Sequence, residues 1–104
     1  MKLNLKDYEF EAKGRKDYDK FTANTKEGLC EIMRVPGIYD SGIEMCEGIK
    51  ITHKIRKSKD TLEVNESEMA LIRKVFEKHI KLGSVFLGGP RYEELVLRVF
   101  KSKD

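Results

Sequence analysis

The stretch that decides the fold is residues 65–83, NESEMALIRKVFEKHIKLG. Apolar residues recur there every three or four positions, so they share one face of a helix. Asn65 and Glu68 have the chemistry of a capping box at its start, and Gly83 suits the left-handed position that follows a helix end. We therefore expect a helix over residues 66–82.

A similar start signal occurs earlier in the chain. Asn24 stands three positions before Glu27, and apolar residues at helical spacing follow until Pro36 and Gly37 interrupt the pattern. This segment predicts a helix over residues 25–34.

A third start signal, Ser41 with Glu44, opens a stretch that fits two structures. Residues 49–56 largely alternate between apolar and polar side chains, as in a half-buried strand. Charged residues also recur at steps of three and four, with acids early and bases late, as the dipole of a helix favours. We predict the helix, over residues 42–57.

The last predicted helix covers residues 90–101. Pro90 suits a first helical position. Apolar side chains then occupy much of the circumference: Tyr92, Leu95, Val96, Val99 and Phe100. Such a helix is either deeply buried or docks on another molecule.

The N-terminal residues have the pattern of strands. Apolar and polar residues alternate from Leu3 to Ala12, and Gly14 supplies a turn into a second strand. We expect an N-terminal β-hairpin over residues 1–23, and either an extended link or a third short strand over residues 60–64. The predicted fold class is α+β, with the hairpin packed against about four helices in a single compact domain.

Length and composition agree with one folded domain. The 104 residues provide for one modest core, and the chain is 38% charged but also 9% aromatic, unlike disordered chains of such charge. The N-terminus shows no signal-peptide pattern, and the longest apolar run, residues 69–72, is far shorter than the roughly 20 residues of a membrane helix. We expect a cytoplasmic location and no membrane partner.

Residues that carry catalysis or bind metals are few and widely spaced. No close pair occurs among the four candidate zinc ligands: Cys30, Cys46, His53 and His79. No nucleophile elbow frames a Cys–His pair, and the glycines before Pro90 lack the spacing of a phosphate-binding loop. We expect no catalytic residue, no metal and no cofactor, and hence no enzyme.

One basic segment supports nucleic-acid binding as an alternative function. Five cations and no acid fall within residues 50–59: Lys50, Lys54, Arg56, Lys57 and Lys59. Such cations can neutralise phosphates. The segment lacks aromatic residues for stacking bases, however, and a charged run of this kind is usually a solvated helix face.

Two expected loops, residues 35–39 and 85–87, are unusually apolar. Loops lie mostly on the surface, where an aromatic–aliphatic cluster often marks an interface. The alternative is that both loops fold back over a small core. We predict a protein-binding cluster with these members: Ile38, Tyr39, Val85, Phe86 and Leu87, with Tyr92 beside them.

The order of elements runs from a hairpin and a short helix through residues 42–57, a Leu-Glu-Val link and an acid-started helix to the closing RYEELVLRVF. In outline, most of the chain resembles small early or accessory proteins that bacteriophages and prophages encode. The resemblance implies a binder in the cytoplasm, that of the host cell if a phage encodes it, which acts by stoichiometric contact with a host or phage macromolecule.

The leading functional hypothesis is a non-enzymatic accessory protein that binds a protein partner and inhibits a host nuclease or defence factor. Nucleic-acid binding through the basic segment is the second hypothesis. The third is a self-assembling structural component, whose homo-oligomer the last helix would stabilise.

Overall fold

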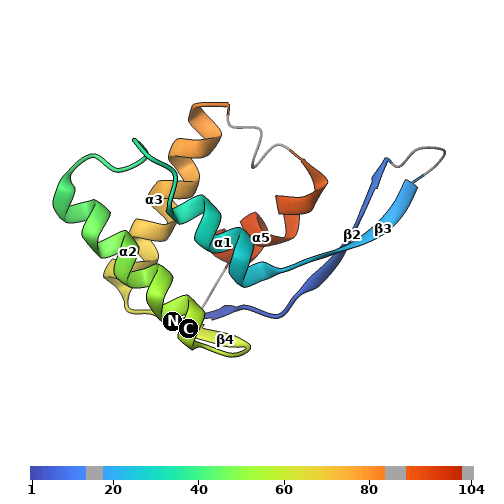
Figure 1. Cartoon of the computed structure of the whole chain (residues 1–104), viewed down its shortest axis with the longest axis horizontal. Coiled ribbons are helices and arrows are strands. Elements are labelled where there is room, and N and C mark those ends of the chain that lie inside the picture. Colours follow the sequence, from blue (N-terminus) through green and yellow to red (C-terminus); the bar gives the residue numbers. More distant parts are fainter. Residues whose placement is uncertain (14–17, 84–88, 102–104) are drawn as a thin grey trace.

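Four helices and four short strands form the part of the chain that the structure describes, residues 1–13, 18–83 and 89–101 of a computed structural model (Figure 1). The helices are α1 (Thr25–Met33), α2 (Gly42–Lys57), α3 (Glu66–Lys81) and α5 (Pro90–Phe100). The strands are β1 (Lys2–Asn4), β2 (Tyr8–Lys13), β3 (Tyr18–Ala23) and β4 (Thr61–Glu63). The α+β class is confirmed, the four helices lie within one residue of their expected bounds, and α2 is a helix and not a strand.

The predicted capping residues begin the first three helices. The side chains of Asn24 and Ser41 accept hydrogen bonds from the backbone three residues later, at 3.0 and 3.2 Å. At the start of α3 the box is reciprocal: Asn65 accepts from the Glu68 amide at 2.7 Å, and the Glu68 carboxylate accepts from the Asn65 amide at 3.0 Å. Gly83 after α3 has φ of +66°, as its position predicts.

The N-terminal residues form two small antiparallel sheets, which corrects the expectation of a single hairpin over residues 1–23. β2 pairs with β3, with Phe10 opposite Phe21, and this hairpin is confirmed. β1 is separate from it and pairs with β4, with Leu3 opposite Leu62. The third strand is therefore present, but it belongs to a second sheet.

Polar side chains between β1 and β2 explain this division. Asn4 Oδ1 accepts from the Lys6 amide at 2.9 Å, and Asp7 Oδ1 accepts from the Thr25 amide at 3.1 Å. Arg98 on α5 donates through Nη1 to the carbonyls of Asn4 and Lys6, at 3.2 and 2.6 Å. These bonds occupy backbone groups that a continuous ladder would use, so the alternation does not continue as one strand.

The β2–β3 hairpin runs out to one side of the helical body (Figure 1). Its base is held by α5, because the Tyr8 hydroxyl donates to the Arg91 carbonyl and the Arg98 guanidinium lies 5.0 Å from the Tyr8 ring centroid. Further out, the rings of Phe10 and Phe21 stack with centroids 5.6 Å apart. The hairpin is thus attached to the domain through one end.

Helix α3 supplies the centre of the core and packs against α1, α2 and α5. Its buried apolar residues are Met69, Leu71, Ile72, Val75 and Phe76. Helix α5 buries Leu95 and Val99, and the Phe100 ring lies edge-on to Phe76 at 6.3 Å. The apolar face of α5 therefore lies within the domain, the first of the two outcomes expected for it.

Candidate functional site

The loop between α1 and α2 turns sharply and inserts one side chain into the core. Gly37 has φ of +81°, a left-handed conformation that glycine adopts without strain. Just after it, Ile38 is buried with 2% of its surface exposed and belongs to the core cluster. The sequence predicts Ile38 at a contact surface, but in the structure it anchors the loop, because a small core draws on the apolar residues of its loops.

Tyr39 fixes the same loop against α2. Its hydroxyl donates to the carbonyl of Met33, the last residue of α1. Its ring lies so close to Gly48 that a Cβ atom there would stand 2.7 Å from Cε1 of the ring, nearer than real side chains approach. Burial raises the pKa of Tyr39 to about 12.

Ion pairs hold the start of α2 to α3. Lys74 Nζ lies 2.8 Å from Asp40 Oδ2 and 2.7 Å from Glu44 Oε2, and Lys78 also pairs with Asp40. Hydrogen bonds from Lys74 and Lys78 lower the pKa of Asp40 to about 2, and bonds to Asp40 and Glu44 raise the pKa of Lys74 to about 12. The α1–α2 loop is therefore fixed to the core, to α2 and to α3.

Between this loop and α2 lies a groove with a cavity volume of about 470 Å³, which we call the apolar groove. The loop contributes Val35, Pro36 and Gly37, and α2 contributes Met45 and Ile49. The other lining residues are Met33, Arg34, Tyr39, Asp40, Ser41 and Gly42. The groove thus combines a loop that the sequence predicts as a contact surface with a helix face that it does not.

Met45 and Ile49 are the candidates that sequence reasoning missed. They stand four positions apart, so they share one face of α2, and 46% and 40% of their surfaces are exposed. A signal for them exists in the sequence. Once residues 42–57 are taken as a helix, both fall outside the face that Ile51 and Ile55 bury in the core.

The remaining members of the predicted contact cluster do not join this groove. Val85, Phe86 and Leu87 lie outside the described residues. Tyr92 is buried on α5 and packs toward α1, where a Cβ atom at Gly28 would lie 3.3 Å from its Cε1. The structure therefore places Tyr92 in the core rather than beside Tyr39 at a surface.

Helix geometry divides the five basic residues of the alternative hypothesis. Lys50, Lys54 and Lys57 recur at steps of four and three and share one face of α2, where Lys54 forms an ion pair with α3 at 3.1 Å. Arg56 lies on a different face, and Lys59 follows the end of the helix. The basic segment is therefore not one surface in the folded chain.

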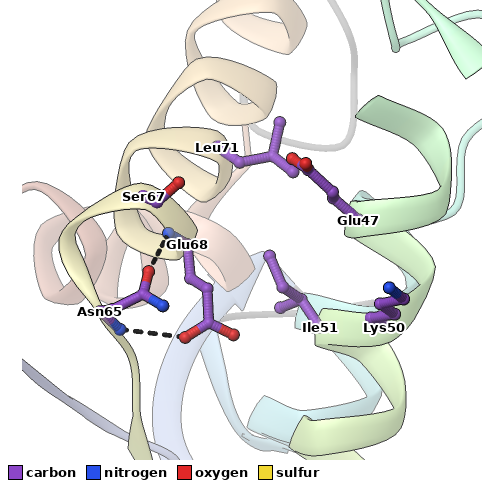
Figure 2. A pocket seen from close by; sticks show the side chains of 7 residues that line it. All are labelled: Glu47, Lys50, Ile51, Asn65, Ser67, Glu68 and Leu71. Atoms are coloured by element: carbon purple, nitrogen blue, oxygen red, sulfur yellow. Dashed lines mark hydrogen bonds between the residues drawn. The ribbon is translucent and has the colours of Figure 1, made fainter. Parts of the chain in front are cut away.

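A smaller hollow of about 230 Å³ lies between α2 and α3 (Figure 2). Ile51 from α2 and Leu71 from α3 point into the space between the two helices. At one end of the hollow Asn65 and Glu68 form the reciprocal cap of α3, and Glu68 also accepts from Lys54 at 3.1 Å. Glu47, Lys50 and Ser67 complete the lining. The polar groups of this cap serve the fold, so we assign the hollow no ligand.

The thiols and imidazoles weighed as zinc ligands have structural or surface positions. Cys30 is buried, its Sγ donates to a backbone carbonyl of α2 at 3.8 Å, and burial raises the pKa of its thiol. His79 is buried with Nε2 3.1 Å from a backbone carbonyl oxygen of α1. The other two, Cys46 and His53, are exposed. Within residues 1–13, 18–83 and 89–101, no three His, Cys, Asp or Glu side chains are grouped to hold a metal ion.

Comparison with protein-family models, with curated proteins and with solved structures gave no match to this chain. None of the described helices combines the length and the apolar character that crossing a membrane requires.

Proposed function

We propose that this chain is a non-enzymatic accessory protein that acts by stoichiometric binding to a protein partner, and that the partner occupies the apolar groove. The observation that carries the proposal is the exposed pair Met45 and Ile49, which faces an apolar loop across a hollow. Contiguous apolar surface with a polar rim is the usual composition of a protein interface.

The groove is held in place by contacts within the chain, which favours binding. Ile38 anchors the loop in the core, Tyr39 bonds it to the end of α1, and Asp40 pairs it with α3. Because the loop is already ordered, little conformational entropy is lost when a partner binds. The resemblance to phage accessory proteins supports a host or phage protein as this partner, and inhibition of a host nuclease or defence factor is the action that we propose.

Affinity capture from a host lysate with matched surface variants tests this function. Ile49 and Leu97 are exposed to nearly the same extent, 40% and 41%, but Leu97 lies on α5 and does not line the groove. Ile49→Glu should lower the amount of partner retained by about tenfold or more, because it places a charge in an apolar contact. Leu97→Glu should retain as much partner as the unchanged chain.

Two controls make the outcome decisive. Thermal unfolding of Ile49→Glu and Leu97→Glu shows whether either variant has lost its fold. If Ile49→Glu is unfolded, Met45→Glu replaces it in the capture assay. Retention of the same proteins by the unchanged chain, Ile49→Glu and Met45→Glu would refute binding through the groove. Loss of all captured protein after nuclease treatment would favour the nucleic-acid hypothesis instead.

Light scattering separates this function from self-assembly. The groove could in principle bind a second copy, and the mass would then rise with protein concentration. The self-assembly hypothesis relies on the apolar face of α5, and that face lies within the core. We therefore expect a constant monomer mass. An oligomer that Ile49→Glu dissociates would assign the groove to self-assembly.

A further inference from the structure

Arg56 extends the exposed face of α2 that borders the apolar groove. It follows Ile49 by seven positions and Met45 by eleven, so the three side chains lie in line along the helix. The distance from Met45 to Arg56 along the helix axis is about 16 Å, at 1.5 Å per residue. This face therefore changes from apolar to cationic within the length of a short peptide.

The apolar groove adjoins further hollows along α1 and α2, which pack against each other (Figure 1). A second hollow of about 350 Å³ shares Arg34 with the apolar groove and is also lined by Lys26 and Arg56. A third hollow of about 470 Å³ shares Lys26 with the second and reaches Lys59. Three adjacent hollows thus follow one another from Met45 past Arg34 to Lys59, and we call the two that Lys26 lines the cationic groove.

Basic side chains outnumber acidic ones in the cationic groove. The bases are Lys6, Lys26, Arg34, Arg56 and Lys59, and the acids are Asp7, Glu27 and Asp60. Side chains of both signs are also engaged within the chain: Asp7 Oδ1 accepts from the Thr25 amide at 3.1 Å, Lys26 donates to the Ser58 carbonyl, and Arg34 Nε donates to the Cys30 carbonyl at 3.4 Å. A concave surface with such an excess of cations attracts carboxylates.

We infer that the two grooves together bind an acidic amphipathic segment of the partner protein. Its apolar side chains contact Met45 and Ile49, and its carboxylates face Arg34 and Arg56. A purely apolar segment would leave the cations unmatched, and a nucleic acid would place phosphates against the apolar wall. The span of about 16 Å corresponds to about eleven residues of helix or about five extended residues. This inference rests on the proposed function and adds the chemistry of the partner.

Selection from a displayed library of random peptides tests the inference. Peptides of about 16 residues exceed the span that the two grooves offer. The library is first depleted on the double variant Ile49→Glu/Arg56→Glu and then selected on the unchanged full chain. Selected peptides are synthesised, and fluorescence anisotropy measures their affinity at about 0.05 and about 0.5 M NaCl, a range over which charge screening changes strongly. Circular dichroism verifies that each variant is folded.

The selected peptides should carry Asp or Glu beside two or more apolar residues. Arg56→Glu should weaken their binding by about tenfold at low salt and by less at high salt, because screening reduces the charge contribution. Lys57→Glu is the matched control, since Lys57 adjoins Arg56 in sequence but lies on a different face of α2, and it should change the affinity by less than about twofold.

Three results would overturn the inference: no enrichment of peptides, enriched peptides without acids, or equal losses for Arg56→Glu and Lys57→Glu. Displacement of the peptides by single-stranded oligothymidylate at low salt would also overturn it, in favour of phosphate recognition. The capture assay separates these failures from failure of the proposed function. A partner that Ile49→Glu loses and Arg56→Glu retains in full would leave groove binding intact and remove only the acidic segment.

Discussion

Helix α2 has two flanks that face different neighbours and differ in chemistry. The flank toward α3 carries Glu44 and Lys54, which form ion pairs with that helix at 2.7 and 3.1 Å. The flank toward α1 carries Met45 and Ile49, which stay exposed beside the apolar groove. Contacts within the chain occupy the first flank, whereas the second is open.

The difference between the flanks locates the surface at which we propose binding. The flank toward α3 carries charged residues because their ion-pair partners lie on that helix. Single exposed apolar residues are ordinary, but a pair that lines a groove opposite an apolar loop forms a contiguous patch. The open flank is therefore a part of α2 whose chemistry the fold alone does not explain.

The largest expected effect separates two isoleucines of α2. Ile51 is 2% exposed and Ile49 is 40% exposed. Ile51→Ala should lower the free energy of unfolding by about 2 kcal/mol or more, because it leaves a cavity in the core. Ile49→Ala should lower it by less than about 1 kcal/mol. Urea titration measures both, and equal losses would mean that burial does not distinguish the flanks.

The next effect concerns the close contact of Tyr39 with Gly48. Alanine in place of a helical glycine usually stabilises by about 1 kcal/mol, but Gly48→Ala should destabilise by about 1 kcal/mol because the new Cβ overlaps the Tyr39 ring. The sign should reverse when Tyr39→Ala removes the ring. Gly42→Ala is the control, since nothing lies within 4 Å of a Cβ atom there. Stabilisation by Gly48→Ala in the unchanged chain would show that the contact does not hold the loop.

A smaller effect compares the N-terminal caps of α2 and α3. Asn65→Ala removes one bond of a reciprocal box and should cost about 1 kcal/mol of stability. Ser41→Ala should cost less, because Glu44 there accepts from the Asp40 amide at 3.3 Å and does not close the box on Ser41. Thermal unfolding ranks the two variants, and a larger loss for Ser41→Ala would contradict the assignment of the complete cap to α3.

The smallest effect is the pH dependence of the ion pairs that hold the start of α2 to α3. The pKa of Asp40 falls from its ordinary value of 3.8 to about 2 in the folded chain, so its ion pairs with Lys74 and Lys78 stabilise fully above pH 3.8 and are lost as the pH falls through 2. The difference in melting temperature between the unchanged chain and Asp40→Asn should therefore disappear as the pH falls from 3.8 to 2. The difference should also shrink in high salt, because these side chains are exposed. A difference that stays constant over this pH range would count against the ion pairs.

The helices could be predicted from the sequence because their signals are local. The Asn65–Glu68 cap and the spacing of apolar residues both act within one or two turns. The pairing of β1 with β4 could not be predicted, because Leu3 and Leu62 are distant in the chain and neither strand specifies its partner. The hydrogen bonds from Arg98 on α5 to the carbonyls of Asn4 and Lys6 are equally non-local.

The candidate site was predicted in part. The apolar α1–α2 loop is visible in the sequence, but Ile38 and Tyr39 are neighbours of similar character, and the turn at Gly37 decides which of them enters the core. Exposure of Met45 and Ile49 depends on which faces of α2 its neighbouring helices cover, and this is a property of tertiary packing.

Methyl spectroscopy of the four methionines tests the central claim most directly. Met45 lies exposed in the apolar groove, Met33 and Met69 are buried in the core, and Met1 lies next to the β1–β4 sheet. When the captured partner is added to chain labelled at the methionine methyl groups, the Met45 signal should shift while those of Met1 and Met69 stay in place. Shifts at Met1 with no change at Met45 would contradict the account, since the partner would then bind away from the groove.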